Sequence, residues 1–179
     1  MAREPERKSR SSMVLTGYVR RIDAHLSPAA VIDPAAVAGG DPALLAAACL
    51  AEVDQDFALR AGEGDLLVIN GALEGGGDPE LALDALQAVG IAAIVCRQAA
   101  AEIVVVADRY GLPIVHAPEA VPLRSEGTLL RLDLERGLVE GAGARWEVAP
   151  LIQSTLDNVR RVQLLARMRR VVEEEGFAE

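Results

Sequence analysis

The chain has 179 residues, a formal net charge of −9, and a composition that is 51% hydrophobic but only 3% aromatic. This length predicts one domain with a proper core, and the scarcity of aromatic residues means that the core must be built from Ala, Val, Leu and Ile. The acidic balance argues against general nucleic-acid binding, which needs a basic face, and no apolar run reaches the length of a membrane span.

The first residues, 1–12, are charged and lack periodicity, which predicts a disordered tail. A basic contact arm is the alternative, although Glu4 and Glu6 dilute its charge. Because this start has no apolar segment of the kind that directs secretion, we expect a cytoplasmic protein. Residues 13–179 are expected to form the single domain, with a sheet and crossover helices in 13–150 and a C-terminal helix in 151–179.

A first strand is predicted over residues 13–22, and the segment from Asp23 to Gly40 after it is predicted to be a loop that Pro28 and Pro34 keep irregular. His25 lies beside Asp23, so it is a candidate general base or ligand. With no second histidine near it in the sequence, a surface histidine is the favoured interpretation.

Asp41-Pro42 is typical of a helix start, with Asp as the N-cap and Pro in the first turn. A second helical stretch is expected from Glu52 to about Gly62. Val53, Phe57 and Leu59 would anchor it to the core. Asp54 and Asp56 on this stretch are interpreted as exposed acids rather than as a carboxylate pair that binds metal.

The pattern from Gly64 to Pro113 predicts a strand, a glycine loop, a helix, a second strand and a second helix. Two apolar strands, 65–70 and 91–96, joined through a helix form a βαβ unit, which implies a parallel pair and a right-handed crossover. Ligands usually bind at the carboxyl ends of such strands. The loop Glu74–Pro79 lies at that position.

This loop has three consecutive glycines before a helix that Asp78-Pro79 starts. Free backbone N–H groups and the helix dipole could make it an anion cradle. Neither the dinucleotide fingerprint nor the P-loop pattern fits it, however. The side chain of Asp78 would also cap these N–H groups, so a structural turn remains the alternative.

A helix is expected over residues 99–110 and a short strand over 112–115. The charged groups of this segment are interpreted as a solvated helix face rather than a substrate clamp; they are Arg97, Glu102, Asp108 and Arg109.

Beyond Pro122, alternating residues predict an antiparallel meander over 127–134, 138–140 and 145–148, with Trp146 as a core or interface anchor. Residues 155–174 predict an amphipathic helix. We expect its apolar residues to face inward and its arginines to face outward. The inward set is Leu156, Val159, Val162, Leu165, Met168 and Val171.

Cys49 and Cys96 are the only cysteines, and both lie in apolar surroundings. Buried reduced thiols are therefore favoured over a disulfide or a metal pair. Two cysteines are also too few for an iron–sulfur cluster, which takes about three or four thiolates.

Several phrases of the sequence resemble the small, or swivel, subunit of 3-isopropylmalate dehydratase and homoaconitase, which is similar to the last domain of aconitase. The matching segments are Gly64-Asp65-Leu66-Leu67-Val68, the glycine turn with Glu80, residues 85–91 (ALQAVGI) and Gly111-Leu112-Pro113. Upstream, residues 31–34 (VIDP) and 41–57 fit the family's early loop and helix, so the resemblance covers the chain from about Gly17 onward. It implies an α/β fold: a swivelling β/β/α domain with a mixed, partly parallel sheet, helices on its faces and a C-terminal helix.

In the family, the turn reads Gly-Ser-Ser-Arg-Glu, where a serine acts as the base and the arginine grips a substrate carboxylate. The matching positions here are Gly76, Gly77, Asp78, Pro79 and Glu80. The hydroxyls and the guanidinium of the family's site are therefore absent from this chain. The remaining candidates for acid–base groups are Asp78, Glu80, Glu74 and His25.

The resemblance implies two hypotheses. In the first, the chain completes a hydro-lyase with an aconitase-like large subunit that carries a 4Fe-4S cluster, acts on a small dicarboxylic or tricarboxylic acid in amino-acid biosynthesis, and itself binds no cofactor or metal. In the second, it is a non-catalytic or substrate-altered paralogue that serves as an interaction module. No nucleic-acid or membrane partner is expected, and homo-oligomerisation stays open.

Overall fold

A computed structural model describes residues 13–37 and 41–176 of the chain. One sheet of seven strands organises it, in the order β4-β3-β2-β1-β5-β6-β7. The strands are β1 (Val14–Ile22), β2 (Asp65–Leu73), β3 (Ile91–Ala99), β4 (Ile114–His116), β5 (Leu129–Asp133), β6 (Leu138–Gly141) and β7 (Ala144–Glu147). The helical segments are α1 (Pro28–Val31), η1 (Pro34–Val37), α2 (Pro42–Ala48), α3 (Phe57–Arg60), α4 (Pro79–Ala88), α5 (Ala101–Tyr110), η2 (Val121–Leu123) and α6 (Gln153–Gly176).

Strand β1 divides the sheet into two halves. It pairs in parallel with β2 on one side and antiparallel with β5 on the other, so β1 to β4 run in one direction while β5 to β7 form a meander. Strands β2 and β3 are parallel and are joined through α4, which confirms the predicted βαβ unit. The mixed, partly parallel sheet expected from the sequence is therefore present.

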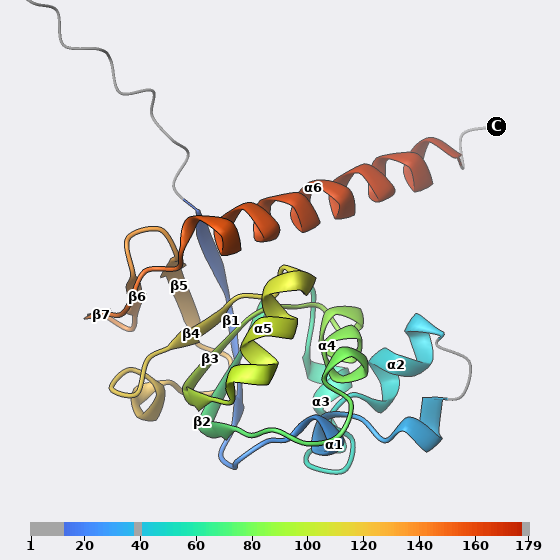
Figure 1. Ribbon diagram of the computed structural model, residues 1–179, viewed down its shortest axis with the longest axis horizontal. Coiled ribbons are helices and arrows are strands. Elements are labelled where there is room, and N and C mark those ends of the chain that lie inside the picture. Colours follow the sequence, from blue (N-terminus) through green and yellow to red (C-terminus); the bar gives the residue numbers. More distant parts are fainter. Residues whose placement is uncertain (1–12, 38–40, 177–179) are drawn as a thin grey trace, which may run out of the picture.

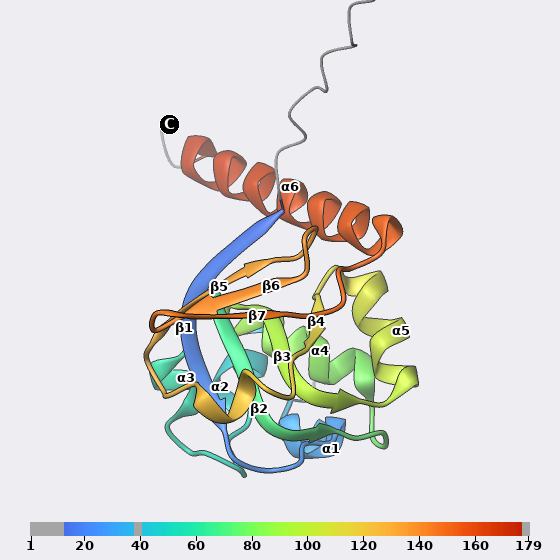
Figure 2. The same cartoon turned by 90° about the vertical axis from the view of Figure 1, so that its left-hand side faces the viewer.

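Each face of the parallel half has its own core. Alternate strand residues such as Leu67, Ile69 and Ile94 pack with residues of α1, α2, α4 and α5 on one face. The residues between them, such as Leu66 and Val68, pack with β5, β6 and the start of α6 on the other. Figures 1 and 2 show α1 to α5 gathered on one side of the sheet, with α6 running above it.

The segment from Asp23 to Gly40 differs from its prediction. Pro28 and Pro34 begin the short helices α1 and η1 instead of keeping the chain irregular. The physical reason is that proline fits the first turn of a helix, where its missing N–H would have had no partner. Ser27 precedes α1 and its carbonyl accepts the N–H groups of Ala30 and Val31.

The helical stretch expected from Glu52 is also reduced. Only the single turn α3 forms, and of the three predicted anchors only Phe57 is buried, whereas Val53 and Leu59 are exposed. Asp54 explains the difference, because its carboxylate accepts the N–H of Asp56 and pairs with Arg60, which favours a turn at this point.

Helix α6 corrects the prediction for the C-terminal helix. Leu156 and Val159 are buried as expected, but Leu165, Met168 and Val171 are at least half exposed. The first turns of α6 pack on the second core, whereas the later turns lie above the body with an open space beneath them, and Arg170 is paired with Glu63 (Figure 1). A periodic apolar stripe indicates that a helix is amphipathic, but it does not indicate which of its turns find a surface to cover.

Three further predictions concern single positions or short segments. Cys49 and Cys96 are buried free thiols, as predicted. Trp146 is partly buried against the second core, and the guanidinium of Arg124 lies 4.3 Å from its ring centre. The predicted disordered tail, 1–12, lies outside the described residues.

Candidate functional site at the carboxyl edge of the parallel strands

The glycine loop lies where the sequence predicts it. Strands β1 to β4 are parallel, so their carboxyl ends meet at one edge of the sheet, and the segment Glu74–Asp78 joins the end of β2 to α4 at that edge. In open sheets of this kind, such an edge is the usual place for a ligand. The side chains of this loop are therefore candidates for contact with a ligand.

The second half of the loop is built as the start of a helix. Asp78 is the N-cap of α4 and its Oδ1 accepts the N–H of Leu81 at 3.1 Å, while Pro79 occupies the first turn. Glu80 pairs with Arg109 of α5 at 3.2 Å. Two of the predicted acid–base candidates, Asp78 and Glu80, thus have structural partners.

The glycines have a geometric role. Gly76 and Gly77 both have positive φ, 100° and 77°, a conformation that side chains rarely adopt. A Cβ on Gly77 would lie 2.7 Å from the backbone nitrogen of Ala29 in α1. A serine cannot stand at position 77 unless α1 moves, so the family's hydroxyl there would need a different loop.

Glu102 fills the space in front of the loop. This residue belongs to the first turn of α5, and its Oε1 accepts the N–H of Gly76 at 3.2 Å. A Cβ on Gly75 would lie 2.1 Å from the same oxygen. Glu102 is exposed, as a residue of a solvated helix face should be, but it also contacts the loop. Its carboxylate takes a backbone N–H that an anionic ligand would need.

His25 and Glu74 are brought together at this edge. A single parallel bridge between Leu26 and Leu73 prolongs the pairing of β1 and β2, which sets His25 beside Glu74. The Nδ1 atom of His25 lies 3.5 Å from Oε1 of Glu74 and also accepts the N–H of Ala72 at 3.2 Å. Both side chains are mostly exposed, at 67% and 59%. A carboxylate beside an imidazole can take up and return a proton.

Beside this pair lies a row of polar side chains, which the sequence did not predict as a group. Asp23 binds the guanidinium of Arg21 at 2.6 Å and accepts a hydrogen bond from Asn70 at 2.9 Å. Asn70 in turn accepts a hydrogen bond from Nε of Arg97 at 3.1 Å. These hydrogen bonds, first that of Arg21 and then that of Asn70, lower the pKa of Asp23. The row fixes Arg97 as an exposed cation at the edge.

A signal in the sequence could have found this row. Asp23, Asn70 and Arg97 each follow directly after a buried strand residue: Ile22, Ile69 and Cys96. Polar side chains at the same point of neighbouring parallel strands meet across the sheet, because the strands are in register there.

The other charged candidates lie elsewhere. Asp54 pairs with Arg60, which lowers the pKa of the Asp54 carboxyl, while Asp56 is exposed as expected, so the two acids do not act as a carboxylate pair. Asp108 accepts a hydrogen bond from Asn158 of α6 at 3.1 Å and joins two helices.

The residues described do not form a metal site. No group of three or more His, Cys, Asp or Glu side chains within 13–37 and 41–176 is arranged to hold a metal ion. Burial raises the pKa of both cysteines to about 12, which disfavours the thiolates that a cluster needs. This donor set does not fit an iron–sulfur cluster. Among the described helices, none has both the length and the apolar character of a membrane span.

Comparison with known proteins gives one consistent group. No family model matches the chain. A 3-isopropylmalate dehydratase small subunit from Caldanaerobacter subterraneus subsp. tengcongensis is 31% identical over 112 residues, which are 62% of this chain and 70% of that protein. A 2,3-dimethylmalate dehydratase small subunit from Eubacterium barkeri is 28% identical over 65% of this chain and 74% of its own length. A 3-isopropylmalate dehydratase small subunit from Syntrophus aciditrophicus is 28% identical over 78% and 86%.

Solved structures share the fold. The crystal structure of 3-isopropylmalate dehydratase from Methanocaldococcus jannaschii has a TM-score of 0.69 and 22% identity, and covers 88% of this chain and 99% of that one. Aconitase X from Thermococcus kodakaraensis has a TM-score of 0.50 and the same identity, over 73% and 91%. The swivel-type fold expected from the sequence is therefore confirmed. Together with the sequence identities, this shows that the chain belongs to the family of 3-isopropylmalate dehydratase small subunits.

Proposed function

We propose that this chain is the small subunit of a cytoplasmic hydro-lyase and that it works with an aconitase-like large subunit on an alkyl-substituted malate. Its relatives are small subunits of 3-isopropylmalate and 2,3-dimethylmalate dehydratases, both named for malates with aliphatic substituents. The reaction would be the isomerisation of 2-isopropylmalate to 3-isopropylmalate, or a homoaconitate-type counterpart. The observation that carries the proposal is the His25–Glu74 pair beside the glycine loop.

The large subunit would carry the 4Fe-4S cluster, which acts as a Lewis acid toward a substrate hydroxyl. The task of the small subunit is then to bind the rest of the substrate and to move a proton. Dehydration removes a proton from one carbon and the hydroxyl from the next, and hydration returns them. An exposed carboxylate such as that of Glu74 can accept this proton and return it, and the imidazole of His25 lies 3.5 Å from it.

A substrate carboxylate also needs a cation. In the family, the arginine of the turn supplies it, but this chain has Pro79 at that position. Arg97 lies at the same edge, and Asn70 holds its Nε so that its outer nitrogens can form a two-pronged contact with a carboxylate. We assign Arg97 the substrate-binding role within this proposal.

The test is to co-express the chain with the large subunit that its genome encodes, reconstitute the cluster, and measure hydration of isopropylmaleate and dimethylmaleate. Glu74→Gln should lower kcat by about 100-fold or more, because it removes a positioned base. Arg97→Gln should raise KM by about tenfold with a smaller change in kcat. Arg109→Gln is the control, since Arg109 is already paired with Glu80 of α4.

Asp78 needs a separate variant, because Asp78→Ala also removes the cap of α4. Asp78→Asn keeps an oxygen that can accept the N–H of Leu81 but removes the charge. If Asp78→Asn abolishes turnover while Glu74→Gln retains it, the base is Asp78 and the role given to Glu74 is wrong. If the two subunits bind each other without turnover on either substrate, the hydro-lyase proposal fails.

A non-catalytic interaction module is the second candidate, and the glycine loop favours it. Gly77 has no room for a side chain, Asp78 caps α4, and Glu102 takes the N–H of Gly76. These contacts stabilise the loop and leave fewer groups for substrate. Under this hypothesis the chain binds the large subunit, and Glu74→Gln leaves every measured property of the complex unchanged.

A further inference from the structure

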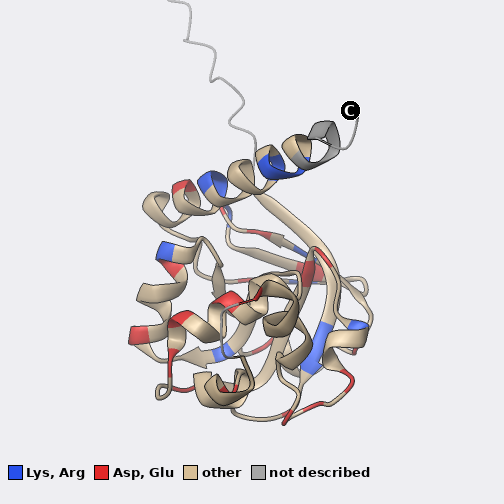
Figure 3. Ribbon diagram, turned by 90° about the vertical axis from the view of Figure 1, so that its right-hand side faces the viewer, with Lys and Arg blue, Asp and Glu red and all other residues tan. Residues whose placement is uncertain are grey.

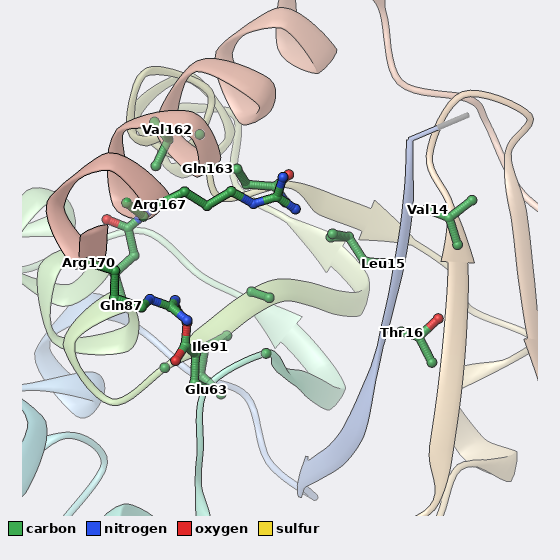
Figure 4. Close-up of a pocket in the computed structure, with 15 residues that line it drawn as sticks. Val14, Leu15, Thr16, Glu63, Gln87, Ile91, Val162, Gln163, Arg167 and Arg170 are labelled. Carbon is green, nitrogen blue, oxygen red and sulfur yellow. Dashed lines mark hydrogen bonds and ion pairs between the residues drawn. The ribbon is translucent and has the colours of Figure 1, made fainter. Parts of the chain in front are cut away.

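A pocket lies between α6 and the amino ends of β1 and β3, at the other end of the parallel strands from the glycine loop (Figure 4). Its volume is about 550 Å³, which is within the range of pockets that hold small organic ligands. Strand β2 has nine residues, so the two ends of the sheet lie roughly 25 Å apart. This pocket cannot share a ligand with His25 and Glu74.

The charge in the pocket is positive. Its lining contains Arg167 and Arg170 of α6 and one carboxylate, Glu63. Arg170 forms an ion pair with Glu63, and Figure 4 shows these two side chains meeting. Arg167 extends toward the side formed by Leu15, and no carboxylate among the residues that the structure describes forms an ion pair with it. The guanidinium of Arg167 is therefore available to bind an anion.

The remaining walls are mainly aliphatic. Leu15 comes from β1, Ile91 from β3 and Val162 from α6, and the amide groups of Gln87 and Gln163 lie between them. Gln87 is held in place because its Nε2 donates to the carbonyl of Tyr110 at 2.9 Å. A ligand that fits these walls has an apolar body and one anionic end.

The orientation of α6 is consistent with a polar ligand. Gln163, Ala166, Arg167 and Arg170 have the spacing i, i+3, i+4, i+7 and form the stripe that faces the pocket. The apolar residues Leu165 and Met168 point away and are 50% and 56% exposed. The arginines of α6 stand out as blue segments along this helix in Figure 3. Cationic side chains that face the rest of the protein are stabilised most when an anion occupies the space between them.

We propose that this pocket binds a small aliphatic carboxylate, with its carboxylate on Arg167 and its aliphatic body against Leu15, Ile91 and Val162. The inference rests on these described residues and not on the function proposed for the carboxyl edge. It assigns the chain a second small-molecule site, under α6, that the family resemblance does not imply.

The direct test measures the affinity of the full chain for three probes by isothermal titration calorimetry. 4-Methylpentanoate carries both the carboxylate and the branched body, 4-methylpentanol lacks the charge, and inorganic phosphate lacks the body. We expect 4-methylpentanoate to bind at least about tenfold more tightly than either of the others, because only it satisfies both parts of the pocket. Equal binding of the alcohol would show that Arg167 does not select the ligand and would overturn the proposal, as would equal binding of phosphate.

Two variants locate the site. Arg167→Gln removes the cation and should weaken 4-methylpentanoate binding about tenfold or more, whereas Arg169→Gln, a matched control two positions along the same helix and outside the lining, should leave it unchanged. Ala166→Phe keeps Arg167 but fills the space and should abolish binding. Amide NMR spectra of both variants check that the fold is retained.

Equal loss in Arg167→Gln and Arg169→Gln would indicate a general effect of helix charge and would overturn the assignment. Unchanged binding in Ala166→Phe would place the ligand elsewhere. If no probe binds to the full chain, but a large subunit protects α6 from hydrogen exchange, the groove is a protein-docking surface and the small-molecule proposal is wrong. None of these results depends on turnover, so the two proposals can fail separately.

Discussion

The two ends of the parallel strands differ in whether their polar and charged groups have partners within the protein. At the carboxyl edge, the glycine loop is satisfied from within: Asp78 caps α4, and Glu102 accepts the N–H of Gly76. At the amino edge, the space beneath α6 keeps a guanidinium, that of Arg167, with no ion-pair partner in the described part of the chain. The edge where the family is expected to bind substrate is thus the more self-contained of the two.

The difference shows that the position of a site and its chemistry are determined by different parts of the sequence. A strand–loop–helix connection in a parallel sheet sets where a ligand would lie, because the backbone determines that edge. The side chains on the loop decide whether a ligand gains anything by lying there. In this protein the connection is preserved, and the exposed groups nearest to it are Glu74 at the start of the loop and His25 and Arg97 from neighbouring segments.

The largest expected effect on stability comes from a substitution that detaches α6 at the amino edge. Leu156 is 2% exposed and fixes the start of α6 on the second core. Leu156→Ala should lower the free energy of unfolding by about 3 kcal/mol, because it removes buried apolar surface and leaves a cavity. Leu165→Ala on the exposed stripe is the control and should change it by less than about 0.5 kcal/mol. Urea unfolding followed by circular dichroism measures both, and equal losses would mean that the outer half of α6 is packed in solution.

A somewhat smaller effect is expected at Gly111, which ends α5 in the left-handed conformation with φ 64°. A Cβ there would lie 2.6 Å from Val162 and 2.9 Å from the carbonyl oxygen of Asn158, both on α6. Gly111→Ala should therefore cost about 2 kcal/mol and push α6 away from α5. Differential scanning calorimetry gives the loss. Gly143→Ala, a glycine of positive φ with open space around it, is the control, and the excess loss at Gly111 measures the close approach alone.

At the carboxyl edge, the cap of α4 is the next largest contribution. Asp78→Ala removes the acceptor of the Leu81 N–H and should destabilise the protein by about 1 kcal/mol, whereas Asp78→Asn should cost only a few tenths. Thermal unfolding of the two variants separates the cap from the charge. If Asn is as damaging as Ala, the charge of Asp78 and not its hydrogen bond stabilises the loop, and the two edges differ less than the structure indicates.

The regular part of the fold could be predicted because its signals are local. The βαβ unit follows from two apolar runs, an Asp-Pro helix start and a terminating glycine, all within fifty positions of one another. The reduced helix at Phe57 and the exposed half of α6 could not be predicted in the same way. Those outcomes depend on how far the rest of the protein extends to cover an apolar stripe, which a periodic pattern does not contain.

The position of the glycine loop was predicted, but the contacts of its side chains were not. The sequence locates Glu74, Asp78 and Glu80 on one loop, but capping and pairing depend on Leu81 and on Arg109 of another helix. The contact of Asn70 with Arg97 depends on strand register, and that of Glu102 with Gly76 depends on where α5 lies relative to the loop. The sequence places Asp23, Asn70 and Arg97 directly after buried strand residues, but which of their atoms meet depends on the register, and the register requires the tertiary fold.

The smallest expected effect concerns Asp84, on the exposed side of α4, whose pKa is raised by desolvation and then by the nearby charges of Glu80 and Asp78. Because the folded state raises this pKa, the ionised carboxylate works against folding. The stability contribution of Asp84 is complete below the ordinary aspartate pKa and is lost as the pH rises through the higher folded value. Asp84→Asn should therefore be slightly more stable than the parent at neutral pH, and the gain should disappear at about pH 3. Urea unfolding at the two pH values measures the difference. A gain that persists at the acid pH would come from helix propensity or packing, and acidic repulsion would then have no part in setting the charge balance of the carboxyl edge.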